Sequence, residues 1–201
     1  MLDSLMRRLT SVGCTNAEAS RSLPSDDIIR DPFYVIDRGM TLTMVPDAAR
    51  AWIGQIGPRK HGRAGWYMPR GIERLLPKKY RSLRHLDPRL FMETGDRFRD
   101  WFEGSTQRWV TVREATKTSI VLVGDRGETV WSWAFTFTPG EDDRTTRVHF
   151  RFRITKVKIR GRRLPLGMRL PDWYVPRWVV RWFEPLDYLY MELFRIALNR
   201  R

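Results

Sequence analysis

Hydrophobic and polar positions alternate most regularly in two runs of the second half of the chain. In residues 129–138 (TVWSWAFTFT) every second position from Trp131 to Phe137 is aromatic, and in residues 146–160 (TRVHFRFRITKVKIR) apolar and basic positions alternate. Because successive side chains of a strand point to opposite faces, both runs predict strands. The predicted apolar face comprises Trp131, Trp133, Phe135, Phe137, Phe150, Phe152 and Ile154, and the predicted basic face comprises Arg147, His149, Arg151 and Arg153. An aromatic face of this size must be covered by another element.

Four further runs have strand character, and turn-forming residues separate the later ones. The runs are 34–44, 97–102, 108–116 and 118–125, and the turns fall at 103–104, 115–117, 125–128 and 139–143. Short connections between consecutive strands favour antiparallel pairing. The second half of the chain therefore predicts a meandering antiparallel sheet.

A long C-terminal helix is predicted to cover the aromatic face. Pro185 suits the first turn of a helix that continues to about Asn199. We expect its apolar stripe to comprise Leu186, Leu189, Tyr190, Leu193 and Ala197, and its polar side to comprise Asp187, Glu192, Arg195 and Asn199. Two shorter helices are predicted after the first strand, at 46–56 and 69–76. The predicted fold is α+β, with a curved antiparallel sheet wrapped around one long helix.

The N-terminal segment is predicted to precede the sheet as a helical lead-in and linker. Residues 1–22 have a helical pattern with a break near Gly13, and Thr15 and Glu18 fit a capping box. We therefore expect a lead-in and linker over 1–30 and a single domain over 31–201.

Six stretches of the chain carry a resemblance to one family. They are GCTNAEASRSLPSDDII (13–29), GMTLTMVPDAARAWIGQIG (39–57), GRAGWY (62–67), ETGDRF (93–98), VWSWAFTFTPGEDDRTTRVHFRFR (130–153) and EPLDYLYMELFRIALNRR (184–201). In them the chain resembles the START-like (SRPBCC) superfamily, in its polyketide cyclase and lipid-transport branch. GRAGWY and the final stretch are the more specific pieces. The chain departs from that branch at Met68 to Gly71, where the branch has Ser-Tyr-Asp-Trp, and in its longer basic loop at 58–61.

The resemblance implies a helix-grip fold with a cavity between the curved sheet and the C-terminal helix. Such a cavity suits a hydrophobic small molecule or lipid, which the protein would carry or sense. The superfamily also includes cyclases, so the alternative expectation is an enzyme of polyketide cyclase or dehydratase type that uses the same cavity. No cofactor is expected in either case.

Ten apolar and aromatic side chains are the candidates for the lining of this cavity. They are Trp66, Tyr67, Trp131, Trp133, Phe135, Phe150, Phe152, Leu189, Tyr190 and Leu193. Apolar residues at strand and helix spacing also form solid cores, so core and pocket both remain open for them. Ligand pockets are mostly apolar with a few polar groups, which Gln55, Tyr67, Thr136 and Tyr190 are suited to supply.

The stretch GQIGPRKHGRAGWY (54–67) resembles a phosphate-binding loop at first sight. Gly57 and Gly62 bracket four residues, but Arg63 and Ala64 follow where a P-loop needs Lys and then Ser or Thr. The stretch also follows a predicted helix, whereas a P-loop follows a strand. We therefore expect a connection between two short helices at the cavity rim, with Arg59, Lys60 and Arg63 as candidate contacts for an anionic head group.

The chain is strongly basic, with 37 Lys and Arg against 23 Asp and Glu and a formal net charge of +14. This charge predicts attraction to nucleic acid, to acidic lipid or to an acidic ligand. Basic and aromatic residues gather in 156–182, where a peripheral contact with an anionic membrane would use Arg162, Arg163, Arg169, Trp173, Tyr174, Arg177 and Trp178. Nucleic acid is a lesser alternative, through the row of Arg147, Arg151 and Arg153.

The sequence shows no pattern typical of catalytic or metal chemistry. His61, His85 and His149 have no partner at ligand spacing, and His149 is expected to be a solvated strand residue. Glu73, Asp96 and Glu114 are the candidate acids, with surface or structural roles favoured for each. Cys14 is the only cysteine, which excludes an internal disulfide.

The N-terminal sequence MLDSLMRRLT lacks the apolar stretch of a signal peptide. A membrane span needs about 18 consecutive apolar residues, and the chain has no such run. The expected location is therefore cytoplasmic, with a peripheral place at the inner membrane face as a further hypothesis.

Overall fold

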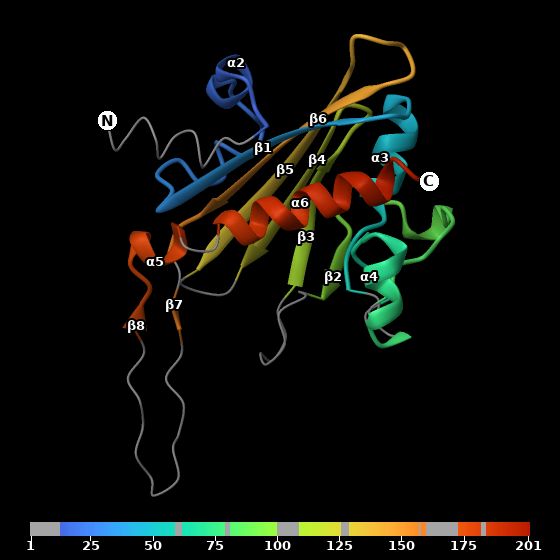
Figure 1. The fold of residues 1–201 in the computed structure, drawn as a ribbon. Helices are drawn as coiled ribbons and strands as arrows, with labels where there is room; N and C mark the ends of the chain where they lie inside the picture. The colour runs from blue at the N-terminus through green and yellow to red at the C-terminus, as the bar shows by residue number, and fades with distance from the viewer. Residues whose placement is uncertain are drawn as a thin grey trace, which may run out of the picture.

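The computed structural model describes residues 13–58, 62–78, 81–99, 109–125, 129–156, 158–159, 173–181 and 184–201. Its architecture is α+β, and a curved antiparallel sheet of six strands carries a C-terminal helix across one face (Figure 1). This part of the prediction is confirmed. Within the described residues, no helix is both long enough and apolar enough to cross a membrane.

The six-stranded sheet has the order β1-β6-β5-β4-β3-β2. Its strands are β1 Tyr34–Leu42, β2 Arg97–Arg99, β3 Trp109–Ala115, β4 Ser119–Asp125, β5 Val130–Pro139 and β6 Thr146–Ile154. Strands β2 to β6 follow one another as an antiparallel meander, and β1 pairs with β6 at the far edge. Two short strands, β7 Lys158–Ile159 and β8 Trp173–Tyr174, form a separate pair.

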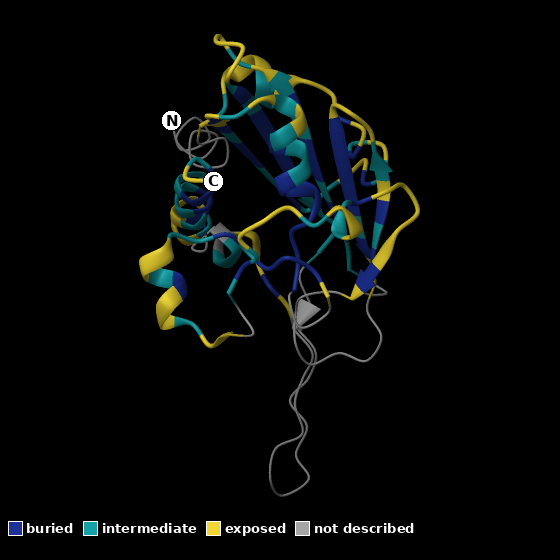
Figure 2. Ribbon diagram, turned by 90° about the vertical axis from the view of Figure 1, so that its right-hand side faces the viewer, coloured by how far each residue is buried: buried dark blue, intermediate teal, exposed yellow. Residues whose placement is uncertain are grey.

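The aromatic face of the sheet lies inward, as the alternation predicts. Trp133 is opposite Phe152 and Phe135 is opposite Phe150 in the antiparallel register of β5 and β6. The ring centroids of Phe135 and Phe150 lie 5.9 Å apart, and both residues are almost completely buried. These rings therefore form part of the main hydrophobic core, and Figure 2 shows the strands of the sheet as largely buried.

The helices begin and end close to their expected positions. They are α2 Asn16–Ser20, α3 Pro46–Gly54, α4 Arg70–Leu75, the single-turn 3-10 helix Pro88–Leu90, α5 Arg177–Arg181 and α6 Glu184–Leu198. Thr15 caps α2, because its hydroxyl accepts from the Glu18 amide while the Glu18 carboxylate accepts from the Thr15 amide. The predicted capping box is therefore confirmed.

Helix α6 presents a different face to the sheet from the one that the sequence predicts. Leu186 and Leu189 are 64% and 53% exposed, whereas Met191, Phe194 and Leu198 are buried. The predicted stripe is therefore wrong at its N-terminal end. Asp187, which was assigned to the polar side, lies against the sheet because it pairs with Arg38 of β1.

The opposite face of the sheet is covered by the segment that precedes β1. Arg147 donates to both carboxylate oxygens of Glu18 at 2.7 Å, and Arg153 pairs with Asp26 at 2.6 Å. The hydrogen bond from Arg147 lowers the pKa of Glu18 to about 2. Residues 13–30 thus pack on the sheet as an outer layer, with α2 above β1 and β6 (Figure 1).

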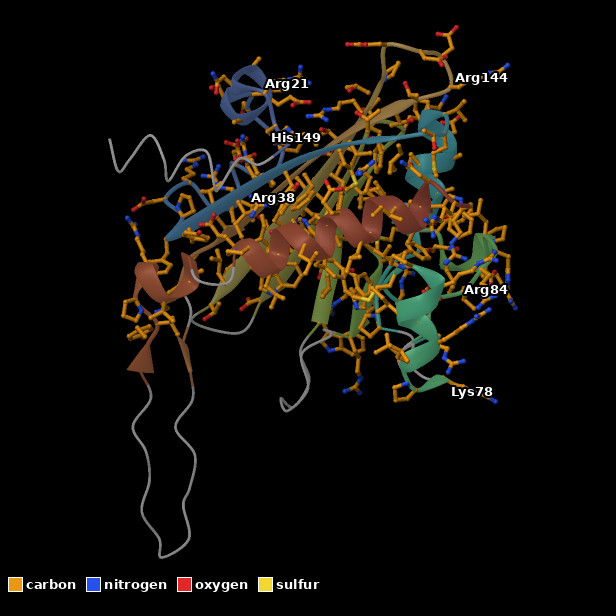
Figure 3. All side chains as sticks on the ribbon, viewed as in Figure 1. Arg21, Arg38, Lys78, Arg84, Arg144 and His149 are labelled. Atoms are coloured by element: carbon orange, nitrogen blue, oxygen red, sulfur yellow. The ribbon has the colours of Figure 1, made fainter. Side chains whose placement is uncertain are left out.

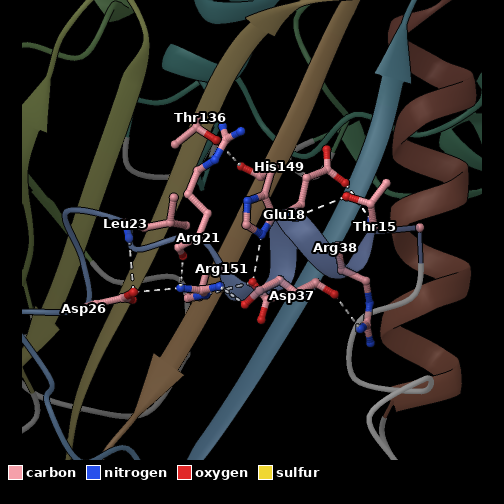
Figure 4. Close-up of polar contacts among 12 residues, drawn as sticks. Thr15, Glu18, Arg21, Leu23, Asp26, Asp37, Arg38, Thr136, His149 and Arg151 are labelled. Atoms are coloured by element: carbon pink, nitrogen blue, oxygen red, sulfur yellow. Dashed lines mark hydrogen bonds and ion pairs between the residues drawn. The ribbon is translucent and has the colours of Figure 1, made fainter.

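Two expectations about this outer face are therefore wrong. His149 is only 3% exposed, and its Nε2 lies 2.8 Å from Oδ1 of Asp37, so it is not a solvated strand residue. Arg151 donates to the same Asp37 oxygen at 2.8 Å and to Asp26 at 2.7 Å (Figure 4). Because the arginine row is used to hold the N-terminal segment, it does not form an open surface for phosphates.

Candidate functional site

A groove runs along helix α6, with Met68 as the one lining residue that does not belong to the helix. Its volume is about 410 Å³, and it is lined by Met68, Leu186, Asp187, Leu189, Tyr190 and Leu193. Five of these residues belong to the helix. Three of them, Leu186, Leu189 and Leu193, lie three or four positions apart and therefore share the side of the helix that is turned away from the core. Met68 comes from the segment between the GRAGWY motif and α4.

A group of aromatic rings lies next to this groove and ties it to the sheet. Trp66 stacks on Trp133 of β5, with ring centroids 5.9 Å apart and an angle of 23° between the planes. Trp66 also meets the ring of Tyr190 edge-on at 6.3 Å. Tyr190 in turn packs on Phe194 at 6.3 Å. The groove therefore has a rigid aromatic side, since four rings from three segments hold one another in place.

An ion pair joins the groove to the inner face of β1. Nη2 of Arg38 lies 3.0 Å from Oδ2 of Asp187, and Figure 3 places Arg38 between β1 and α6. The side chain of Arg38 is 3% exposed and that of Asp187 is 33% exposed. Burial raises the pKa of Asp187 above its ordinary value, and Arg38 opposes this shift. Asp187 is thus a partly shielded carboxylate at the boundary between core and groove.

Tyr190 carries a buried hydroxyl group near its contact with Trp66. Its oxygen is buried and has no hydrogen-bond partner among the described residues. Burial raises the pKa of Tyr190 well above its ordinary value, and the charge of Asp187 raises it further. The Tyr190 hydroxyl is therefore a neutral group that can both donate and accept a hydrogen bond.

Glu184 is a second buried acid, on the first turn of α6. The residue is 4% exposed, and neither carboxylate oxygen has a hydrogen-bond partner within the described residues. Burial raises its pKa to about 7, with a smaller contribution from the charge of Asp187. Glu184 is not among the residues that line the groove. Because Glu184 is buried, a negative charge on its carboxyl group is unfavourable.

The ten predicted lining residues divide between groove and core. Leu189, Tyr190 and Leu193 line the groove, and Trp66, Trp133 and Phe152 are half-buried against the core. The other four belong to the hydrophobic core, namely Tyr67, Trp131, Phe135 and Phe150, each at most 3% exposed. Met68, Leu186 and Asp187 also line the groove, although the sequence did not predict them as lining residues. Met68 stands out in the sequence only as a departure from the branch that the chain resembles.

Two of the proposed polar groups, Tyr67 and Gln55, hold the interior of the fold. The Tyr67 hydroxyl donates to the carbonyl of Trp52 at 3.1 Å and accepts from Nε2 of Gln55 at 2.7 Å. Gln55 also donates to the carbonyl of His85 and accepts from the amide of Asp87. Both residues are fully buried. They therefore fasten the segment after α4 to helix α3 instead of facing a ligand.

Thr136, the remaining polar candidate, lies on the other side of the sheet from the groove. Its hydroxyl donates to the carbonyl of His149 at 3.3 Å. This position follows from the alternation of β5, because Thr136 faces away from Phe135 and Phe137.

The basic loop after α3 turns the chain back, as expected. Gly57 and Gly65 pair as an isolated β-bridge, and both have positive φ, at 133° and 92°. Arg63, a candidate anion contact, faces inward: its guanidinium donates to the carbonyls of Gly54 and Ile56 at 2.7 and 3.2 Å. Its side chain therefore closes the loop instead of reaching the rim. The other two candidates, Arg59 and Lys60, lie outside the described residues.

Most of the predicted membrane-contact residues also fall outside the described parts of the chain. Arg162, Arg163 and Arg169 are among them, as are the side chains of Trp173 and Trp178. Tyr174 is 52% exposed, and Nζ of Lys156 lies 5.1 Å from the centre of its ring. The guanidinium of Arg177 lies 5.2 Å from the ring of Phe33. These two cation–aromatic contacts place positive charge where β8 and α5 lie.

The candidate acids and Cys14 have structural surroundings. Glu73 is buried and accepts a hydrogen bond from the hydroxyl of Ser82, Glu114 accepts from Ser119, and Asp96 is exposed. Burial is the main cause that raises the pKa of the Cys14 thiol to about 12. Within the part of the chain that the structure describes, no group of three or more His, Cys, Asp or Glu is placed to hold a metal ion.

Comparisons with known proteins give a likeness of structure alone. No protein-family model matches the chain. A search of curated proteins finds no match. Protein CV1439 of Chromobacterium violaceum is 12% identical with a TM-score of 0.41, and the match covers 83% of this chain and 94% of that one. Protein MLL2253 of Mesorhizobium loti is 13% identical with a TM-score of 0.43, covering 83% of this chain and 98% of that one.

Proposed function

We propose that the protein binds a hydrophobic small molecule or lipid in the groove beside α6, and carries or senses it. The observation that carries this proposal is the lining of the groove, where five of the six residues are apolar or aromatic. Its volume of about 410 Å³ falls within the range of small-molecule sites. A groove with an apolar lining and few polar groups favours burial of a ligand's hydrocarbon surface.

The fold that would carry this function is the helix-grip fold of the START-like superfamily. The order of strand, two short helices, strand meander and long C-terminal helix supports this assignment, together with the GRAGWY motif and the motif of the final helix. Phe135 and Phe150 are almost completely buried, whereas Leu189, Tyr190 and Leu193 line the groove. We therefore place the proposed ligand between helix α6 and Met68.

Binding of a fluorescent hydrophobic probe tests the proposal directly. We expect the neutral probe N-phenyl-naphthylamine to bind the folded protein with one saturable site and to be displaced by long-chain amphiphiles. Leu189→Asp, which puts a charge into the groove, should weaken probe binding at least tenfold. Leu86→Asp is the matched control, because Leu86 is 37% exposed and is not among the lining residues. Equal affinities of the two variants would refute the groove as the site.

A peripheral contact with an anionic membrane is a second candidate function. Leu75 of α4 is 85% exposed, and Arg70, Arg74 and Lys78 around it are exposed as well. Figure 2 shows α4 as largely exposed, and Figure 3 shows Lys78 and Arg84 pointing away from the protein near it. An apolar side chain surrounded by cations is suited to insert among anionic head groups. The contact would bring the groove, whose residue Met68 directly precedes α4, to a source of lipid.

A further inference from the structure

The contacts of residues 13–30 with the outer face of the sheet lie over β4, β5 and β6. Leu23 packs on Val121 of β4 and on Ala134 of β5. The ion pairs of Glu18 and Asp26 lie on β6. Strands β3 and β2 follow beyond β4, and β2 is the edge strand of the sheet. The exposed side chains of β2 and β3 therefore determine what this part of the outer face offers to a partner.

Three of these side chains form a cluster of one aromatic ring and two cations, named here the Trp109 cluster. Arg97 and Arg99 flank Phe98 on β2, and Trp109 begins β3. Because Phe98 and its partner Val110 are buried in the core, the alternation of each strand turns the three to the outer face. Both guanidinium groups lie 5.4 Å from the centre of the Trp109 ring, which belongs to a residue that is 37% exposed.

The two arginines of the cluster keep their N–H donors available. A guanidinium over an aromatic ring is attracted by the face of the ring, and this contact uses none of its donors. Within the described part of the chain, neither Arg97 nor Arg99 forms an ion pair. One exposed acid, Asp125, ends the neighbouring strand β4, and it has a partner of its own. The cluster therefore presents free donors and positive charge around an exposed indole ring.

Other exposed groups of the same kind lie at the same end of the molecule. Because neighbouring strands are antiparallel, the start of β3 and the end of β6 lie at one end of the sheet, and the contact of Lys156 with Tyr174 follows β6 there. Figure 1 shows α4, which carries the 85% exposed Leu75, in the lower half of the molecule together with β2 and the start of β3. The turn at the other end of β5 has three exposed acids at 141–143.

We propose that the Trp109 cluster is a membrane-contact site, at which the indole ring enters the head-group region of an anionic bilayer and Arg97 and Arg99 bind lipid phosphates. This inference rests on the proposed contact of α4 with membranes. Tryptophan suits the bilayer interface because its ring is apolar and its N–H group is polar, and arginine donates to phosphate oxygens in pairs. A nucleic acid would use the ring and the arginines but not Leu75, so the exposed leucine favours a bilayer.

Two double variants that remove the same charge test the site. Arg97→Gln with Arg99→Gln should weaken binding to vesicles that contain phosphatidylglycerol at least fivefold. Lys117→Gln with Arg144→Gln is the matched control, because both residues are exposed in turns at the other end of the strands, and Figure 3 shows Arg144 far from Lys78 of α4. The control should stay within twofold of wild type. Equal losses in the two double variants would overturn the inference, because net charge alone would then account for binding.

The indole ring is tested by a pair of single variants. Trp109→Ala should weaken vesicle binding at least threefold, and the loss should persist at raised salt, where the contribution of the arginines is screened. Trp109→Phe keeps an apolar ring and should bind better than Trp109→Ala. Wild-type affinity in folded Trp109→Ala would contradict insertion of the ring. If Trp109→Ala does not fold, as judged by circular dichroism, the two double variants decide the inference.

Leu75→Ser separates a failure of this site from a failure of the α4 contact. If Leu75→Ser loses vesicle binding while Arg97→Gln with Arg99→Gln binds as wild type does, the inference fails and the α4 contact stands. If the wild-type protein binds no anionic vesicles, both fail, and binding of N-phenyl-naphthylamine still tests the groove independently. If the Arg97 and Arg99 double variant loses affinity for a single-stranded oligonucleotide but not for vesicles, the inference is overturned in favour of a nucleic acid.

Discussion

Arg38 of β1 and Asp187 of α6 form an ion pair, with Nη2 of the arginine 3.0 Å from Oδ2 of the aspartate. Nη1 of Arg38 also donates to the carbonyl of Asp37 at 3.0 Å, which holds the guanidinium close to its own strand. The pair joins the first strand of the sheet to the last helix of the chain. It lies where β1 meets α6, a helix that buries Met191, Phe194 and Leu198 and leaves Leu186 and Leu189 exposed.

Breaking this pair should destabilise the protein. Arg38→Met leaves the Asp187 carboxylate partly buried without its partner, and we expect the free energy of unfolding to fall by about 3 kcal/mol. The double variant Arg38→Met with Asp187→Leu should regain most of that loss, because no uncompensated charge remains. Urea unfolding followed by tryptophan fluorescence measures both.

The half-exposed pair of Arg195 and Glu192 is the control for this experiment. Its side chains are 37% and 34% exposed, so Arg195→Met should cost less than about 1 kcal/mol. If the losses of unfolding free energy in Arg38→Met and Asp187→Leu simply add in their double variant, the role given to the Arg38–Asp187 pair is contradicted.

Glu184 should make the stability of the protein depend on pH. Its pKa in the folded protein is about 7, above its ordinary value of 4.5, so the folded state holds the proton more tightly than the unfolded state. The resulting stabilisation is complete below pH 4.5 and is lost as the pH rises through about 7. We expect Glu184→Gln, which resembles the protonated acid, to remove this part of the pH dependence.

The measurement is the urea midpoint of wild type and variant at pH 5 and pH 8. The difference between the two pH values should shrink in Glu184→Gln and stay unchanged in Glu141→Gln, since Glu141 is exposed. A Glu184→Gln variant with the full pH dependence of wild type would show that another group is responsible.

Asp37 should hold the N-terminal segment on the outer face of the sheet. Its Oδ1 atom meets both His149 and Arg151 at 2.8 Å, and Arg151 continues to Asp26 and to the carbonyls of Ala19 and Arg21. We expect Asp37→Asn to lower the free energy of unfolding by about 2–4 kcal/mol, because buried Arg151 loses one of its two counter-charges and keeps only Asp26.

Hydrogen exchange locates this effect. Amides of residues 13–30 should exchange faster in Asp37→Asn, while those in β3 and β4 should change less. Asp143→Asn is the control, since Asp143 is exposed and its substitution should change the stability by less than about 0.5 kcal/mol. Unchanged exchange in residues 13–30 would show that the segment is held by other contacts.

Tyr67 should matter for stability but not for ligand binding. Tyr67→Phe removes the hydroxyl that bonds to Gln55 and to the carbonyl of Trp52, and we expect a loss of about 1–2 kcal/mol on unfolding. Affinity for N-phenyl-naphthylamine should stay within twofold of wild type. A large loss of probe affinity in the folded variant would show that Tyr67 contributes to ligand binding after all.

Leu75 should contribute to contact with anionic membranes. Sedimentation with vesicles that contain phosphatidylglycerol should bring down the wild-type protein, with less bound as salt is added. Leu75→Ser should lower the bound fraction at least threefold. Val45→Ser is the control, because Val45 is 47% exposed and lies before α3, away from α4. Equal binding to neutral and anionic vesicles, or none to either, would refute this contact.

The sequence predicts the elements of this fold well because their signals are local. Alternation along β5 and β6 depends on residues two positions apart, and the capping box of α2 joins Thr15 to Glu18, three positions apart. The glycines of the loop after α3 likewise predict a turn, since only their own backbone conformation is involved. These features follow from the chain itself before any tertiary contact forms.

Only the tertiary structure determines which face of each helix or strand is buried and which charges on it are paired. Asp187 reads as a surface residue in the sequence, and only its pairing with Arg38, almost 150 positions earlier, turns it toward the sheet. The arginines of β6 read as an open basic surface until Glu18 and Asp26 of the N-terminal segment meet them. Periodicity along a chain gives the spacing of side chains on a face. The partner that neutralises a charge on that face comes from a distant segment, so only the folded chain determines which face is buried and which is left for a ligand.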